Sequence, residues 1–243
     1  MIDSTFVIVV AGTFVASLFN AAFSAGGALI VLAITSTVLP VQAIVPIHST
    51  LLIGSTATRI LFFWDYIDWA LVRPFIAGSL VGAFLGARIY VALPEAIIAV
   101  AIALVMLIAI WLPGLSWRPR IRHPWAVVGF VHSFLSTLFA YGALLHAVIL
   151  HTKLDRRQIV GTLGGCLAGM SVFKIAGYAF YGFDYRPYYA VIAAAVIVSF
   201  AGTAIGKMIV DRLSEERFRL VYRVLITASA LRLLYTGLWQ EGT

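Results

Sequence analysis

The sequence has few charged residues. Only 11% of the 243 residues are charged, whereas 62% are hydrophobic, and the mean hydropathy is +1.02. A soluble domain carries about 25% charged residues, so this chain lacks the polar groups to cover a water-exposed surface of its size. The composition excludes a soluble globular protein and predicts one whose apolar side chains face lipid as well as each other.

Cysteine and carboxylate side chains are also scarce. Cys166 is the only cysteine, which excludes a disulfide within the chain and a cysteine-rich metal site. Every Asp and Glu stands at the end of an apolar segment or in a loop, and His146 and His151 are not at the i, i+4 spacing of helical metal ligands. We therefore expect no metal and no other cofactor.

Lysine and arginine are absent before Arg59. A cleavable signal peptide begins with a basic region, so the apolar N-terminal segment is expected to stay in the mature protein. The net charge of +7 is assigned to loops that face an anionic cytoplasmic leaflet rather than to nucleic-acid binding. The sequence shows no nucleophile–base pairing and no phosphate-binding loop of the P-loop type, so we expect no enzyme.

Ten apolar segments divide the chain into two similar halves. Helices are expected throughout, because an open sheet edge cannot be satisfied in lipid and the runs lack the alternation of a barrel. The fold class is therefore an all-α polytopic membrane protein, with a first repeat over 1–112, a polar linker over 113–125 and a second repeat over 126–243. The predicted helical segments are 5–22, 27–39, 43–63, 74–92 and 95–112, then 126–140, 143–152, 158–181, 188–206 and 218–239.

The halves match at a nearly constant offset, which predicts an internal duplication of the kind found in many transporters. A shift of 115 residues places Gly27 on Gly142 and Arg59 on Lys174. A shift of 116 places Asp68-Trp69 on Asp184-Tyr185, and a shift of 120 places Gly82 and Gly86 on Gly202 and Gly206. We interpret these last four glycines as helix-packing residues.

The second segment of each half is too short for an ordinary crossing, so it either re-enters near Gly26-Gly27 or Gly142 or crosses obliquely. Both alternatives give an odd number of crossings per half and hence inverted repeats. Under inversion one side of the membrane receives eleven Lys and Arg residues and the other three, whereas parallel halves split them six to eight. The positive-inside rule favours inversion, with both termini outside, the linker 113–125 in the cytoplasm and the chain in the cell inner (plasma) membrane.

Arg59 and Lys174 are cations inside apolar segments. A charge at the middle of a spanning helix costs about 2.5–3.5 kcal/mol even on a lenient scale. At equivalent positions of inverted repeats, the two side chains would approach one site from opposite sides and supply charge for an anion. The alternative is that they extend to the membrane interface, which is easier for Arg59 because it lies five residues before Trp64.

The breaks at Gly26-Gly27 and Gly142 are the second candidate feature. A helix that restarts at such a break presents free backbone N–H groups to an anion, although glycine also permits a tight turn or close packing. Polar side chains near the breaks complete the predicted binding set: Ser24, His48, Ser49, Thr50 and Tyr141. Serine and threonine also join membrane helices, and His48 and His132 are alternative carriers of a coupling proton.

At these motifs the sequence resembles the sulfite exporter TauE/SafE family, whose halves carry an early glycine element, an Ala/Ser/Thr-rich stretch, an aromatic DW pair and a small-residue helix. The matching stretches are SAGGALIV, LPVQAIVPIHST, Ile67-Asp68-Trp69 and GSLVGAFLGAR, then GGCLAGMSVFKIAGYAFYGFDY and AGTAIGKMIVDRLSEERFR. The resemblance covers nearly the whole chain. It implies export or uptake of sulfur-containing anions, such as sulfite or small organosulfonates, by a secondary carrier.

The sequence therefore predicts a secondary transporter of a small anion, with alternating access around a site near the midplane. An anion channel and a non-transporting membrane scaffold or assembly factor are the alternatives. The expected partners are the anionic substrate and the lipid bilayer. A coupling proton or sodium ion and a homodimeric assembly are left open.

Overall fold

All regular elements in the described part of the chain are helices, which confirms the predicted all-α class. The computed structural model describes residues 4–23, 27–111, 124–140, 142–149, 151–209 and 215–239. Within these ranges, four stretches are long and apolar enough to cross a bilayer: Val41–Tyr66, Trp69–Ala92, Arg157–Phe180 and Arg186–Gly206. A polytopic membrane protein is the fold class that these lengths and compositions support.

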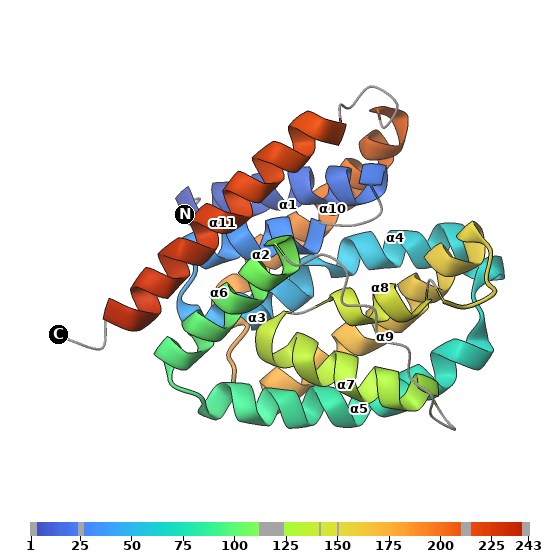
Figure 1. Cartoon of the computed structure of the whole chain (residues 1–243), viewed down its shortest axis with the longest axis horizontal. Helices are drawn as coiled ribbons and strands as arrows, with labels where there is room; N and C mark the ends of the chain where they lie inside the picture. Colours follow the sequence, from blue (N-terminus) through green and yellow to red (C-terminus); the bar gives the residue numbers. More distant parts are fainter. Residues whose placement is uncertain are drawn as a thin grey trace. The chain divides into compact units, whose positions relative to one another are not determined.

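The helices follow the predicted segments closely (Figure 1). Polar residues, glycine and proline separate the apolar runs, and the chain leaves the helical conformation at those residues. In chain order the elements are α1 (Ser4–Phe23), α2 (Gly27–Val38), α3 (Val41–Leu51), α4 (Ile53–Phe63), η1 (Trp64–Tyr66), α5 (Trp69–Ala92), α6 (Glu95–Trp111), α7 (Pro124–Phe139), α8 (Ala143–Ile149), α9 (Arg156–Phe180), η2 (Arg186–Tyr188), α10 (Tyr189–Ile209) and α11 (Glu215–Trp239).

The structure differs from the prediction most clearly in two places. The segment expected at 43–63 is two helices, because Leu52 forms a turn between α3 and α4. Helix α5 begins at Trp69 instead of residue 74, because the carboxylate of Asp68 accepts hydrogen bonds from the backbone N–H groups of Ala70 (2.9 Å) and Leu71 (3.3 Å). This N-cap starts the helix one turn ahead of Pro74, which the helix then contains.

The chain forms two compact units, each of which draws on both predicted halves. Unit 1 comprises Met1–Ser55, Leu93–Pro113 and Tyr185–Thr243, and unit 2 comprises Thr56–Ala92 and Gly114–Asp184. The division into repeats at 1–112 and 126–243 therefore stays a prediction, and most of the linker 113–125 lies outside the described residues.

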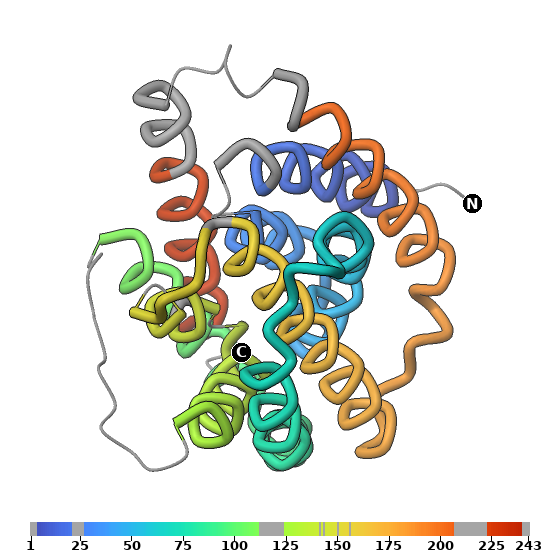
Figure 2. Tube along the Cα trace, turned by 90° about the vertical axis from the view of Figure 1, so that its right-hand side faces the viewer, coloured from blue at the N-terminus to red at the C-terminus, as the bar shows by residue number. Residues whose placement is uncertain are grey.

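Unit 1 is built on two helix pairs. Helix α1 packs along α10, and α6 packs along α11, as both views of the chain show (Figures 1 and 2). Gly202 of α10 makes the first pairing close, because a Cβ at this position would lie 2.5 Å from the backbone oxygen of Phe14 in α1. This contact confirms Gly202 as a packing residue.

Unit 2 is organised by the pairing of α5 with α7, which lie side by side in Figure 1. Gly82 of α5 faces the backbone oxygen of Phe130, and Gly86 faces Thr137, both on α7. Gly129 of α7 in turn faces the backbone of α5. Because glycine carries no side chain, the two backbones approach closely, as in membrane helix dimers.

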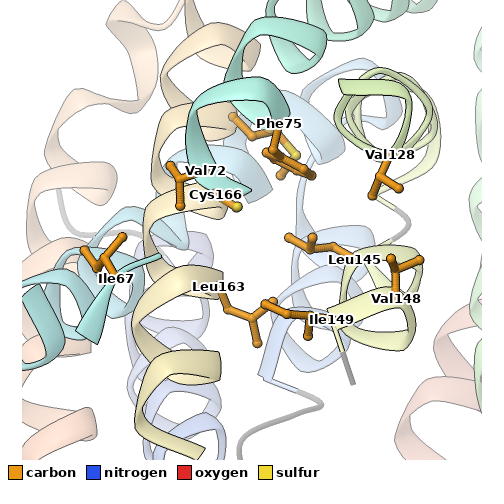
Figure 3. Packing of buried hydrophobic residues seen from close by; sticks show 10 residues of the cluster. Ile67, Val72, Phe75, Val128, Leu145, Val148, Ile149, Leu163 and Cys166 are labelled. Carbon is orange, nitrogen blue, oxygen red and sulfur yellow. The ribbon is translucent and has the colours of Figure 1, made fainter. Parts of the chain in front are cut away.

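A set of buried apolar side chains joins the remaining helices of unit 2 (Figure 3). Figure 3 shows Leu145 and Ile149 of α8 near Leu163 of α9, with Phe75 of α5 above them. The short helix α8 is therefore anchored by its apolar residues. The full set is Ile67, Val72, Phe75, Val128, Leu145, Val148, Ile149, Leu163, Cys166 and Met170.

Large apolar side chains also cover the outside of the helices, as expected for a surface in contact with lipid tails. Leu61, Phe180, Ile197 and Trp239 each expose most of their surface, with values of 71%, 74%, 69% and 70%. A soluble protein rarely exposes so many large apolar groups together.

Substitution of Gly82 by alanine should destabilise unit 2 by about 1–3 kcal/mol, because the added methyl group collides with a main-chain oxygen that cannot move independently of α7. The melting temperature in detergent measures this effect. Val81→Leu enlarges a lipid-facing neighbour on the same helix, 58% exposed, and should leave the melting temperature unchanged. Equal melting temperatures for Gly82→Ala and Val81→Leu would contradict the close approach.

Candidate functional site

The predicted binding residues divide between the two units. Arg59, Gly142 and Lys174 belong to unit 2, whereas Gly27, His48, Ser49 and Thr50 belong to unit 1. Ser24, Gly26 and Tyr141 lie outside the described residues. The two cations that the sequence singled out are therefore in the same unit.

Lys174 is buried in the interior of unit 2. Its side chain is 2% exposed, and its Nζ donates hydrogen bonds to the backbone oxygen (2.9 Å) and the hydroxyl (3.1 Å) of Ser136. Among the described residues, no carboxylate forms an ion pair with it. The ammonium of Lys174 thus points inward to α7 and does not extend to the membrane interface.

The position of Lys174 follows from the contact of α9 with the last turn of α7. Tyr178 lies one turn further along α9, and its hydroxyl donates to the backbone oxygen of Thr137. The ring of Tyr178 packs edge-on against Tyr90 of α5, with the ring centroids 5.4 Å apart. Side chains on two successive turns of α9 therefore bind carbonyl groups at the end of α7. The helix dipole favours a positive charge at this end.

Arg59 lies on α4, where α9 crosses it. A methyl group at Gly164 of α9 would lie 3.0 Å from the Cβ of Arg59. Gly164 is ten residues before Lys174 on α9, which is about 15 Å along the helix axis. The guanidinium of Arg59 has no hydrogen-bond partner among the described residues, and it interacts electrostatically with His146.

Two histidines lie near enough to these cations to interact with them electrostatically. His146 of α8 interacts electrostatically with both Arg59 and His132, and His132 of α7 interacts in turn with Lys174. Arg59, His146, His132 and Lys174 therefore form a series of basic side chains through unit 2, which we call the basic series. The described part of the chain contains no group of three metal-ligating side chains.

Sequence reasoning considered His132 and His146 for metal or proton chemistry but did not place them in an anion site. The spacing of polar residues around His132 nevertheless indicates a polar helical face. In the stretch His132-Ser133-Phe134-Leu135-Ser136 of an otherwise apolar segment, the polar residues recur at spacings of three and four, which places them on one helical face.

The hydroxyl groups differ in whether they are free to bind a ligand. Ser49 donates to the backbone oxygen of Val45, and Thr50 donates to that of Ile47, so both predicted ligands bond within their own helix. The buried hydroxyl of Ser133 has no hydrogen-bond partner in the described structure. Serine in a helix usually donates to the carbonyl group one turn earlier, and Ser133 is an exception to that habit.

The break between α7 and α8 is made by Ala140 rather than by Gly142. Ala140 ends α7 with a φ of 56°, in the left-handed region that an alanine seldom adopts. A methyl group at Gly142 would meet no neighbour within 4 Å. The seven-residue α8 that follows rises only about 10 Å, too little to cross the bilayer core.

In unit 1, the predicted residues have structural contacts. A Cβ at Gly27 would lie 2.6 Å from the backbone oxygen of Ala16 and from the Cβ of Asn20, both in α1, so glycine is needed for packing there. His48 approaches the backbone oxygen of Ala28 at 2.9 Å from its Nε2 and ties α3 to α2. Unit 1 also has a surface hollow lined by Val41 of α3 together with Pro94, Glu95 and Thr236.

The comparison with protein families shows to which family the chain belongs. The model of the family described as sulfite exporter TauE/SafE matches residues 8–233, nearly the whole chain. The chain belongs to the TauE/SafE family. No curated protein and no solved structure matches it.

Membership in the TauE/SafE family implies membrane transport of sulfur-containing anions. It is a family of transporters rather than enzymes, and its members act on a small anionic substrate within a lipid bilayer. The buried Lys174, which has no carboxylate partner among the described residues, suits such a substrate.

Alanine substitution at the two glycine breaks should affect the stability of this TauE/SafE family member differently. Gly27→Ala should lower the melting temperature, because the methyl group collides with α1, whereas Gly142→Ala should leave it unchanged, because nothing occupies that space. Thermal unfolding in detergent checks both variants. A large loss of stability in Gly142→Ala would contradict the open environment of this glycine.

Proposed function

We propose that this chain is a secondary transporter of a small sulfur oxyanion or organosulfonate, such as sulfite, and that the anion binds in unit 2 at Lys174. The observation that carries the proposal is the burial of Lys174 without a carboxylate partner among the described residues. An anion that arrives and leaves would complete the charge balance of this residue during each cycle.

The ammonium of Lys174 keeps a hydrogen-bond donor for a ligand beside its structural contacts. Interaction of Lys174 with the C-terminal end of α7 stabilises the ammonium by about 0.3–1 kcal/mol, or about 2 kcal/mol in a favourable buried geometry. Burial of the charge costs about 2.5–3.5 kcal/mol or more. Ser136 satisfies two of the three N–H donors of the ammonium, and the third is available to an oxygen of the substrate.

Arg59 would act as a second positive charge on the path of the anion. Its distance along α9 from Lys174 argues against one site that both side chains clamp together. The basic series instead offers successive positions, from Arg59 through His146 and His132 to Lys174. Such a series would draw an anion inward without holding it in one deep minimum.

Repeats that exchange helices would provide the symmetry that alternating access uses. Gly82 faces the backbone oxygen of Phe130, and its predicted equivalent Gly202 faces that of Phe14, which lies 116 residues before Phe130. In the same way, a Cβ at Gly54 would meet Val196 of α10, and a Cβ at Gly169, which lies 115 residues after Gly54, would meet Ile76 of α5, 120 residues before Val196. These paired contacts support two repeats in which the first helix of each half packs on the other half.

The remaining parts of the proposal rest on the sequence. Both termini would lie outside the inner (plasma) membrane, with the linker 113–125 in the cytoplasm. A proton or sodium gradient would drive transport, and a homodimer is compatible with the lipid-facing surface. Four residues of unit 1 stay predicted ligands of the anion: Gly27, His48, Ser49 and Thr50.

Replacement of Lys174 by methionine, which has a similar shape and no charge, should lower sulfite transport at least about tenfold, because a charged hydrogen bond to the anion is lost. Uptake into proteoliposomes under an imposed proton or sodium gradient measures the effect. The control is Lys153→Met, which removes an exposed lysine and should transport like the unmodified protein.

Two results would contradict the proposal. Equal uptake by Lys174→Met and Lys153→Met would remove the role of the buried ammonium. Flux that follows only the concentration gradient of sulfite, whichever ion gradient is imposed, would indicate an anion channel instead of a secondary transporter.

A further inference from the structure

We infer that His132 and Ser133 are direct ligands of the transported oxyanion, with His132 Nε2–H and Ser133 Oγ–H as neutral donors beside the ammonium of Lys174. This inference rests on the proposed function, and it names the oxygen-binding groups of that site. It is carried by two buried polar atoms that have no partner in the described structure, His132 Nε2 and Ser133 Oγ.

The backbone of α8 fixes the tautomer of His132. The N–H of Leu145, in the first turn of α8, donates to His132 Nδ1 at 3.3 Å. A ring nitrogen that accepts a hydrogen bond carries no proton, so the proton of the neutral imidazole is on Nε2. His132 therefore caps α8 with one nitrogen and presents a donor with the other.

That donor is held in a defined direction. The imidazole ring of His132 is fully buried, and it packs against Phe75 of α5 with the ring centroids 5.9 Å apart. Its Nε2 has no partner among the described residues. A buried donor without an acceptor costs about 1–3 kcal/mol, and proteins seldom carry this cost without a functional reason.

Ser133 repeats the pattern at the next residue of α7. Its side chain is fully buried, and its hydroxyl has no partner in the part of the chain that the structure describes, whereas neighbouring hydroxyl groups in unit 2 bond to their own helix. Thr137 donates to the backbone oxygen of Ser133, and Ser171 donates to that of Leu167. The free hydroxyl of Ser133 is therefore a property of its position and not of serine in these helices.

The helical register brings the three donors to one region. His132 and Ser133 lie four and three residues before Ser136, so all three share one face of α7. Ser136 binds the ammonium of Lys174 directly, and Lys174 interacts electrostatically with His132. One charge and two neutral donors of α7 and α9 thus lie close to Ser136, along one stretch of α7.

This set of groups selects a class of ligand. A group with several oxygen atoms and a negative charge, as in sulfite or a sulfonate, can accept from all three donors at once. A substrate that lacks one oxygen acceptor would leave a buried donor unsatisfied, and sites of this kind discriminate strongly against such analogues.

Two substitutions of His132 separate its two nitrogens. His132→Gln keeps an amide donor near the position of Nε2, whereas His132→Asn can keep a polar partner for Leu145 but is too short to replace the Nε2 donor. We expect His132→Asn to weaken binding of sulfite and methanesulfonate at least about tenfold, and His132→Gln to stay within about threefold of the unmodified protein.

Ser133→Ala should weaken binding of the same two anions by about tenfold, because it removes the second donor. Ser171→Ala is the matched control, since it removes a buried hydroxyl of unit 2 that bonds within its own helix. Affinity is measured by calorimetry in detergent, and the melting temperature without anion reports on folding.

The outcomes distinguish the inference from the proposed function. If the unmodified protein binds neither anion, the proposed function fails. If it binds them, and both His132→Asn and Ser133→Ala bind them equally well, the inference fails while the proposed function stands. If His132→Asn does not fold, the ring nitrogens of His132 in the unmodified protein decide by ¹⁵N NMR: added methanesulfonate should shift the Nε2–H resonance, and an unchanged resonance would overturn the inference.

Discussion

The hydrogen bonds of Lys174 to Ser136 are the constraint on which the interior of unit 2 depends. They hold an ammonium group among apolar helices, where a charge is costly, and they join α9 to the end of α7. The surrounding residues are arranged to tolerate this charge: Tyr178 binds the next carbonyl group, and no described carboxylate competes for the lysine. A positive interior of this kind suits a protein whose cargo is negative.

Two histidines add polar groups to the interior of unit 2 beyond Lys174. A second full charge beside Lys174 would raise the cost of burial, whereas neutral imidazole rings add hydrogen-bonding capacity without adding charge. Electrostatic interactions through His146 and His132 therefore link Arg59 to Lys174. In the proposed transporter, this arrangement would bind an anion where almost no polar surface is available.

Much of the fold could be predicted from the sequence, because segment length and glycine patterns act locally. The positions of the helices, the packing roles of Gly82, Gly86 and Gly202 and the membership in the TauE/SafE family all agree with it. The turn at Leu52 carries no such local signal. The left-handed Ala140 could not be predicted either, since alanine has no intrinsic preference for that conformation. The free donors of the site depend on which neighbour each atom meets, so periodicity alone could not reveal them.

The glycine contacts between α5 and α7 have a mechanical consequence. Where two main chains touch, no layer of flexible side chains lies between them to absorb a sliding or rolling motion. We therefore expect α5 and α7 to move together as one rigid body. His132 on α7 would keep its orientation relative to α5 in such a movement. Conformational change in this molecule must therefore occur where helices meet through side chains rather than through backbone contacts.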